Sequence, residues 1–333
     1  MSSIHVFLNH ITENAKHLKS VCDTSNISIV GVTKGFCADL RIAEAILNAG
    51  INSLGDSRLQ NLVKLRNAFG ASVELMMLRL PMISQASELV HVCDVSLNSE
   101  ISTIEALNNA AIEQNKRHKV VLMVDLGDRR EGIEVNSVIE VCRQVLTFSN
   151  IKLIGLGVNL SCLSGVLPDS NNLGTLSLLA DQVRKELGVD LPIVSGGGTS
   201  SFSLISRGEM PSGVTQLRLG ESILLGFDSA FNLPIPGLRQ DTFVLRVPCS
   251  RVLVSEQEDD KNMVVGAVTS LDVRFSGLTP VLKGVMIVDP DAQSLMCKVP
   301  KDWEGDCLDF SIDYVAMLSS FTSDFVDKNY HLN

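Results

Sequence analysis

Residues 27–50 read Ile27-Ser-Ile-Val-Gly-Val-Thr-Lys-Gly-Phe-Cys-Ala-Asp-Leu-Arg-Ile-Ala-Glu-Ala-Ile-Leu-Asn-Ala-Gly50. The first part, Ile27–Lys34, is a short and nearly continuous apolar run, which is typical of a strand that is buried on both faces. In Asp39–Ala49, apolar residues recur at helical spacing, Asp39 is suited to cap the helix start, and Gly50 follows the helix end. The stretch therefore predicts one strand–helix unit with a short link.

The same alternation continues through the first two-thirds of the chain. The candidate strands are Ile27–Lys34, Ile51–Asp56, Val73–Leu78, Val92–Leu97, Lys119–Leu126, Ile151–Leu160, Leu191–Gly196 and Val214–Gly220. The helix-like segments between them are Asp39–Ala49, Ser57–Phe69, Ile101–Asn115, Asn136–Phe148 and Leu173–Leu187. Repeated strand–helix units predict a parallel sheet, and eight of them predict a closed TIM-like (β/α)8 barrel. The alternative is an open doubly wound sheet, but no strand here leads into the G-x-G-x-x-G motif.

The pattern changes after Gly226. A bridge rich in proline and glycine, Asn232–Gly237, is followed by short apolar runs separated by turn-forming residues. These runs are Phe243–Val247, Val252–Ser255, Met263–Val268, Val285–Val288 and Leu308–Leu318. We therefore predict a barrel domain over residues 1–230 and a smaller β-rich domain over residues 238–333.

The composition excludes several classes of protein. The chain has 333 residues, a formal net charge of −10, 45% hydrophobic residues and 20% charged residues. The acidic excess argues against nucleic-acid binding in which basic side chains neutralise phosphates. We expect neither a secretory signal nor a membrane span, because no basic segment precedes an apolar core and no run of about 18 apolar residues occurs. Eight cysteines are scattered without a C-x-x-C pair, which favours reduced thiols and a cytoplasmic protein.

The C-terminal ends of the barrel strands are where catalytic groups of such barrels lie. The first strand ends in Lys34, which can act as an amine nucleophile toward carbonyls or can simply extend into solvent. The fifth strand ends in the charged segment Asp125–Gly132. That segment can be a solvated ion-pair turn, or it can present Arg130 to an anionic oxygen.

Two further segments near the end of the barrel suggest a cofactor. The loop Ser195–Ser201 follows the seventh strand, where barrels often bind phosphate, although such a loop can also be only a turn. In the eighth strand, Arg218 lies between Leu217 and Leu219, and a buried charge needs a partner or a ligand. A lysine, a phosphate-type loop and an arginine together fit a phosphorylated aldehyde cofactor such as pyridoxal phosphate.

The chain resembles the ornithine racemase branch of the alanine racemase family, a family of fold-type III enzymes that depend on pyridoxal phosphate. The resemblance extends from Ile4 to about Tyr330. Its motifs are Val32-Thr-Lys-Gly-Phe-Cys37, Gly55-Asp-Ser-Arg58, Leu78-Arg-Leu-Pro-Met82, Asp94-Val-Ser-Leu-Asn-Ser-Glu100, Val124-Asp-Leu-Gly-Asp-Arg-Arg-Glu-Gly132, Gly157-Val-Asn-Leu-Ser-Cys162, Ser195-Gly-Gly-Gly-Thr-Ser200 and Leu217-Arg-Leu-Gly-Glu-Ser222.

The resemblance implies roles for residues around the cofactor ring. Lys34 resembles the lysine that holds the cofactor as a Schiff base and acts as one proton-transfer base. Arg130 resembles the arginine that contacts the cofactor's phenolic oxygen, and Asn159 takes the place of a histidine against the ring. Arg218 resembles the arginine that faces the pyridine nitrogen. Because an arginine keeps its proton, that nitrogen stays unprotonated, which favours racemisation over transamination or decarboxylation.

The resemblance also implies a phosphate site, and the sequence departs from the family pattern at several positions. Thr199 and Ser200, with the backbone around Gly220 and Glu221, resemble the phosphate cradle, and Tyr314 resembles a tyrosine near the phosphate. Ornithine racemases usually have Asn-Ser where this chain has Gly-Thr at positions 198 and 199, and the β-rich domain diverges further.

Racemisation requires a second base on the opposite face of the substrate. In alanine racemases this base is a tyrosine from the partner's β-rich domain, but neither Tyr314 nor Tyr330 lies in that motif. Asp272 and a cysteine of the β-rich domain are the candidates for this base. The resemblance thus predicts a homodimeric racemase of a free basic amino acid such as ornithine or lysine. The alternatives are a non-catalytic protein of pyridoxal phosphate homeostasis and a decarboxylase of the same fold.

Overall fold

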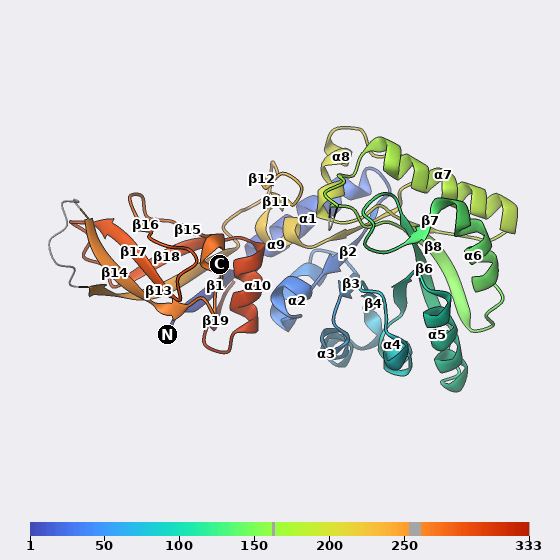
Figure 1. Cartoon of the computed structure of the whole chain (residues 1–333), viewed down its shortest axis with the longest axis horizontal. Helices are drawn as coiled ribbons and strands as arrows, with labels where there is room; N and C mark the ends of the chain where they lie inside the picture. Colours follow the sequence, from blue (N-terminus) through green and yellow to red (C-terminus); the bar gives the residue numbers. More distant parts are fainter. Residues whose placement is uncertain (162–163, 253–260, 333) are drawn as a thin grey trace.

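The computed structural model describes residues 1–161, 164–252 and 261–332 of the chain. Figure 1 shows a barrel surrounded by helices and, beside it, a β-rich part that holds both chain ends. In the described part of the chain, the barrel consists of eight strands. They are β2 (Ser28–Val32), β3 (Ser53–Asp56), β4 (Glu74–Met77), β5 (Val95–Asn98), β6 (His118–Asp125), β8 (Ile151–Gly157), β9 (Ile193–Ser195) and β10 (Gln216–Leu219).

The barrel is closed. Its strands pair in parallel in the order β5-β4-β3-β2-β10-β9-β8-β6, and an additional pairing of β5 with β6 joins the two ends. The short β7 (Ile133–Glu134) adds to the end of β6. The prediction of a TIM-like (β/α)8 barrel is confirmed, and the open doubly wound alternative is wrong because that sheet would leave β5 and β6 apart.

Helices cover the outside of the barrel. They are α1 (Leu8–Asp23), α2 (Leu40–Leu47), α3 (Leu59–Phe69), α4 (Ala86–Val92), α5 (Ile101–Glu113), α6 (Val138–Val145), α7 (Ser170–Leu187), α8 (Ser203–Ser206) and α9 (Glu221–Leu225). Asp39 caps α2 as predicted, because its side chain accepts hydrogen bonds from the backbone N–H groups of Arg41 and Ile42 at 3.0 and 3.4 Å. Inside the barrel, strand side chains such as Val30, Met76 and Val121 form a separate apolar core.

The C-terminal part is a mostly antiparallel sheet with one helix. Its strands are β13 (Phe243–Val252), β14 (Lys261–Thr269), β15 (Leu278–Pro280), β16 (Met286–Ile287), β17 (Ser294–Pro300), β18 (Cys307–Ile312) and β19 (Asp327–His331). The predicted strand Leu308–Leu318 is wrong beyond Ile312, where α10 (Tyr314–Thr322) begins. Asp313 caps this helix by accepting a hydrogen bond from the backbone N–H of Ala316 at 2.7 Å. Of the predicted strand Val252–Ser255, only Val252 lies within the described residues.

The N-terminal strand β1 (Ser3–Phe7) joins this C-terminal sheet. It pairs antiparallel with β13 and parallel with β19, so that Ser3 lies opposite Arg246 on one side and Asp327 on the other. The division into residues 1–230 and 238–333 stays a prediction, and this pairing adds that residues 3–7 take part in the C-terminal sheet.

Two further findings concern the whole described chain. The seven cysteines that the structure describes are all free. Across residues 1–161, 164–252 and 261–332, no helix is long and apolar enough to cross a membrane.

Candidate active site

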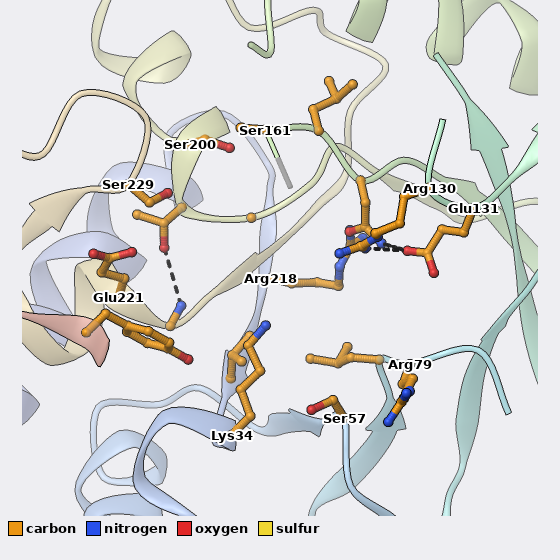
Figure 2. Close-up of a pocket in the computed structure, with 18 of the residues that line it drawn as sticks. Lys34, Ser57, Arg79, Arg130, Glu131, Ser161, Ser200, Arg218, Glu221 and Ser229 are labelled. Carbon is orange, nitrogen blue, oxygen red and sulfur yellow. Dashed lines mark hydrogen bonds and ion pairs between the residues drawn. The ribbon is translucent and has the colours of Figure 1, made fainter. Parts of the chain in front are cut away.

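A cavity of about 670 Å³ opens at the C-terminal ends of the barrel strands. It is lined by all the residues that were predicted to contact the cofactor: Lys34, Arg130, Asn159, Thr199, Ser200, Arg218, Gly220, Glu221 and Tyr314. Figure 2 shows Arg218, Arg130 and Glu131 gathered on one side of the cavity and Glu221 and Ser229 on the other, with the Lys34 amine between them. The fold thus brings together side chains from both parts of the protein.

Lys34 follows strand β2 after one residue, Thr33, and begins a 3-10 turn (Lys34–Phe36). The strand end below it is fixed, because the buried Thr33 hydroxyl donates a hydrogen bond to Asp56 Oδ2 at 2.6 Å. Burial raises the pKa of Asp56, while hydrogen bonds from Thr33, Arg58 and Asn61 oppose that rise. The exposed Lys34 side chain therefore extends from a rigid base into the cavity.

Tyr314, the first residue of α10, closes the cavity next to this lysine. A Cβ atom placed on Gly35 would lie 2.8 Å from the Tyr314 hydroxyl oxygen and 2.9 Å from Met317 Cε. Glycine therefore allows a close approach of the barrel and α10 at this point, and a larger residue would have to displace these side chains. Burial raises the pKa of Tyr314, and the Glu221 carboxylate raises it further, so this phenol stays protonated at neutral pH.

Arg218 is the most deeply placed charge of the site. It lies on β10, is only 5% exposed, and donates hydrogen bonds to the Val158 carbonyl at 2.7 Å, to Asn159 Oδ1 at 2.6 Å and to the Ser195 hydroxyl. Ser195 in turn donates to Gln216 Oε1 at 3.0 Å. These acceptors offset the cost of burying the guanidinium and fix its direction.

Arg130 lies at the cavity rim with a partner that the sequence did not indicate. Its guanidinium donates to Glu131 Oε1 at 2.5 Å, and the Glu131 side chain is only 12% exposed. Asn159 Nδ2 donates to the same carboxylate oxygen. The charged segment around Arg130 contained Glu131, but a carboxylate next to an arginine in a turn is usually solvated, so the pattern could not distinguish it.

The loop after β9 and the end of β10 form a small polar cradle. Thr199 and Ser200 are buried, and the Thr199 hydroxyl lies 3.3 Å from the Ser222 hydroxyl. The backbone N–H groups of Gly220 and Ser222 point to Thr199 Oγ1 at 3.5 and 3.4 Å. These distances are long for hydrogen bonds, so the N–H and hydroxyl groups have capacity for a better acceptor, such as a phosphate oxygen. Gly198 completes the cavity wall here.

Glu221 contributes a side chain as well as the backbone that was predicted. Its pKa is raised to about 7, first by burial and then by the carboxylates of Asp313 and Asp228, while Lys34 lowers it. An acid that titrates near neutral pH inside a cavity is typical of functional sites.

Asp272, the predicted second base, lies outside this cavity within one chain. It accepts hydrogen bonds from the hydroxyls of Thr269 and Ser323, both at 2.8 Å. Burial raises the pKa of Asp272, but the two hydroxyls outweigh burial and hold that pKa below its usual value. Its catalytic role stays a prediction.

Sequence reasoning did not assign other residues that line the cavity. Ser57, Arg79 and Ser161 belong to quoted motifs but had no role, while Ser229 lay in a loop without a distinctive pattern.

Comparisons with known proteins show the family of this chain. The family model for the alanine racemase N-terminal domain matches residues 6–226. The ornithine racemase of Acetoanaerobium sticklandii is 34% identical to this chain, over 98% of this chain and 98% of its own length. The lysine racemase of Thermotoga maritima is 31% identical, over 97% of this chain and 96% of its own length.

A solved structure supports the same fold. The alanine racemase of Clostridium difficile 630 superposes with a TM-score of 0.80 over 100% of this chain and 96% of that chain, at 15% sequence identity. The family model and the relatives together confirm the resemblance that the strand-end motifs indicated. The chain belongs to the alanine racemase family.

Proposed function

We propose that this protein is a pyridoxal phosphate-dependent racemase that interconverts the L and D forms of a free basic amino acid, such as ornithine or lysine. The observation that carries the proposal is the meeting of Lys34, Arg218 and the polar cradle around Thr199 in one cavity. An amine, a fixed guanidinium and a phosphate-sized polar site are the groups that this cofactor needs.

The residues present fit the cofactor. Thr199, Ser200 and the Gly220 backbone would hold the phosphate, with the Tyr314 hydroxyl as a further donor. Lys34 would hold the aldehyde carbon, and Arg218 would face the ring nitrogen. When bound, pyridoxal phosphate withdraws electrons from the amino acid and makes its Cα proton acidic.

Lys34 and Arg218 have different tasks in the reaction. Lys34 reaches the cavity from one side, so its amine takes and returns the proton on one face of the substrate Cα. Arg218 keeps its own proton, because the pKa of arginine exceeds about 12. It therefore donates hydrogen bonds without transferring a proton, which favours return of the proton to Cα over competing reactions.

The opposite face needs a second base, and within residues 1–161, 164–252 and 261–332 neither tyrosine of the chain is placed to supply it. Tyr314 touches Gly35 beside Lys34 and so lies on the lysine's side, while Tyr330 donates a hydrogen bond to Asp39 at 2.6 Å. We therefore propose a homodimer in which Asp272 of the partner subunit, or a neighbouring group, supplies the second base. The exposed side chains of Leu271 (84%) and Phe325 (73%), which flank the hydrogen-bonded Asp272, support a protein contact at this surface.

The substrate and location complete the proposal. The relatives named ornithine racemase and lysine racemase support a basic amino acid. The free cysteines that the structure describes are compatible with a cytoplasmic protein.

The test is chiral chromatography of the purified protein with pyridoxal phosphate and a panel of L-amino acids. We expect a D-isomer to form from ornithine or lysine, without release of CO₂ or an aldehyde. Release of CO₂ would identify a decarboxylase instead. Tight cofactor uptake with no product from any amino acid would support the non-catalytic homeostasis protein.

A further inference from the structure

Glu131 is a nearly buried carboxylate in the cavity wall. Its side chain is 12% exposed, and burial of a carboxylate costs free energy unless donors surround it. Its donors are Arg130, at 2.5 Å, and Asn159 Nδ2. Both donors line the cavity, so Glu131 is connected to the site on two sides.

The turn that carries Glu131 is rigid. Asp125 Oδ1 accepts hydrogen bonds from the backbone N–H groups of Gly127 and Arg129 at 2.9 and 3.1 Å. Gly132 has a φ of +122°, and a Cβ atom there would lie 2.4 Å from the Asp125 nitrogen. The turn therefore folds back onto the end of β6 and directs Glu131 to the cavity wall, in contrast to a mobile ion pair on the surface.

Asn159 connects Glu131 to Arg218 by hydrogen bonds. An arginine can only donate hydrogen bonds and a carboxylate can only accept them. The Asn159 amide is accordingly held with Oδ1 toward Arg218, at 2.6 Å, and Nδ2 toward Glu131. A side chain without an acceptor oxygen at position 131 would leave one end of this amide without its acceptor, whereas glutamine would keep an acceptor and lose only the negative charge.

We propose that Glu131 is a positioning residue: it holds Arg130 at the cavity wall and holds Asn159 against Arg218. Glu131 thereby links the two arginines, so that a change at Glu131 affects the placement of both. The kinetic consequence rests on the proposed function, whereas the linkage itself can be measured on the bound cofactor alone. The carboxylate also offsets the positive charge of Lys34, Arg130 and Arg218 around the cavity. Its removal disfavours every protonated amine there.

The experiment compares Glu131→Gln, Glu131→Asp, Asn159→Ala and the double variant Glu131→Gln/Asn159→Ala with Glu134→Gln as the matched control. Glu134 is exposed on β7 and lies outside the cavity. For each protein loaded with pyridoxal phosphate, the visible absorption is recorded between pH 6 and 9, and kcat and KM are measured. Circular dichroism reports whether each variant is folded.

We expect Glu131→Gln to move the pH midpoint of the cofactor absorption downward by about half a unit to one unit, because a compensating negative charge is lost. Its kcat should fall about 10- to 100-fold, with a smaller change in KM. Glu131→Asp should restore the midpoint, since it keeps the carboxylate, and Glu134→Gln should match the wild type. In the Asn159→Ala background, Glu131→Gln should change kcat by no more than about threefold.

Several results would overturn the proposal. One is a Glu131→Gln protein that behaves like Glu134→Gln. Another is an increase in KM with unchanged kcat and absorption, which would make Glu131 a direct substrate contact. Independent, multiplying effects of the two single variants would also contradict the linkage. If Glu131→Gln does not fold, the Glu131→Asp variant decides instead. A downward midpoint shift in Glu131→Asp, as large as the one expected for Glu131→Gln, would contradict the proposal, because aspartate keeps the carboxylate. A wild type that binds cofactor but racemises nothing would refute the proposed function, while the absorption measurements would still decide the role of Glu131.

Discussion

The barrel and the C-terminal sheet contribute to the site in different ways. Barrel strands such as β10 and β5 are buried along their whole length, so their polar groups at the strand ends are held by a tightly packed wall. In the C-terminal sheet, β17 alternates between buried and more exposed side chains, as expected when one face meets water. The barrel supplies all but one of the predicted cofactor contacts, and α10 adds Tyr314.

This difference indicates a division of labour. The barrel holds the groups that must be fixed before the reaction, namely Lys34, Arg218 and the polar cradle around Thr199. The C-terminal part places Tyr314 against Gly35 within the chain and leaves Asp272 outside the cavity. Changes in the barrel should therefore abolish chemistry, whereas changes at the boundary between the two parts should mainly alter stability.

The largest effect is expected at Lys34. Lys34→Ala should lose the visible absorption of the bound cofactor and lower racemase activity more than about 1,000-fold, because the amine that holds the cofactor and moves the proton is gone. Lys152→Ala is the matched control, since Lys152 is an exposed lysine near the opposite end of strand β8. Absorption spectra and chiral chromatography check both variants. A Lys34→Ala protein that keeps the wild-type spectrum would mean that another lysine holds the cofactor.

Much of the barrel could be predicted from sequence because its signals are local. Most strands are short apolar runs followed by a helix, and the strand-end motifs carried the cofactor residues. The C-terminal part depends on distant contacts instead. Strand β1 pairs with residues near positions 245 and 330, and nothing in Ser3–Phe7 itself indicates those partners.

Two errors have specific physical causes. Apolar residues recur along the whole of Leu308–Leu318. The change from strand to helix depends on the cap that Asp313 provides, and that single residue did not outweigh the recurring apolar residues. Glu131 was not identified because its near burial follows from the fold of the turn up to Gly132, which charge pattern does not reveal.

The next largest effect is expected at Arg218. Arg218→Glu should lower racemisation about 100-fold, because donors to a fixed position are lost from a water-poor site. A carboxylate there would also favour a protonated ring nitrogen, so slow conversion of the cofactor to its amine form should appear. Arg218→Lys keeps a positive charge and should retain more activity, although it cannot reproduce the fork of donors.

The measurements for Arg218 are racemisation rate, cofactor content and the amount of amine-form cofactor after prolonged turnover. Each variant must first be shown to bind the cofactor, since a lost site would mimic lost activity. Wild-type racemisation by a loaded Arg218→Glu protein, with no side reaction, would show that this residue does not face the ring nitrogen.

A smaller effect is expected at the boundary between barrel and α10. Gly35→Ala should lower the free energy of unfolding by about 1–3 kcal/mol, because the added methyl group overpacks against Tyr314 and Met317. In a Tyr314→Ala background the same substitution should cost less. Gly174→Ala is the control, because Gly174 lies inside α7 and nothing is within 4 Å of its Cβ position. This variant should raise the free energy of unfolding by up to about 1 kcal/mol. Urea denaturation measures the wild type and all four variants, and equal costs in both backgrounds would contradict the predicted contact.

The smallest effect is expected at Glu221, and it depends on pH. The pKa of Glu221 is raised from 4.5 to about 7, chiefly by burial, so the folded protein binds a proton there that the unfolded chain has already lost above pH 4.5. The wild type therefore loses stability as the pH rises from about 4.5 to 7, and the full cost of ionising Glu221 is present above pH 7.

Glu221→Gln removes this titration. The free energy of unfolding of Glu221→Gln relative to that of the wild type should be higher at pH 8 than at pH 5, by roughly 1–2 kcal/mol. Glu44→Gln, at an exposed position on α2, should show no such change between the two pH values. Urea denaturation of the cofactor-free proteins at pH 5 and pH 8 makes the comparison without interference from the bound phosphate. If the difference between wild type and Glu221→Gln is the same at both pH values, Glu221 ionises as freely as a surface carboxylate, and the barrel end must be more open to water than its packing implies.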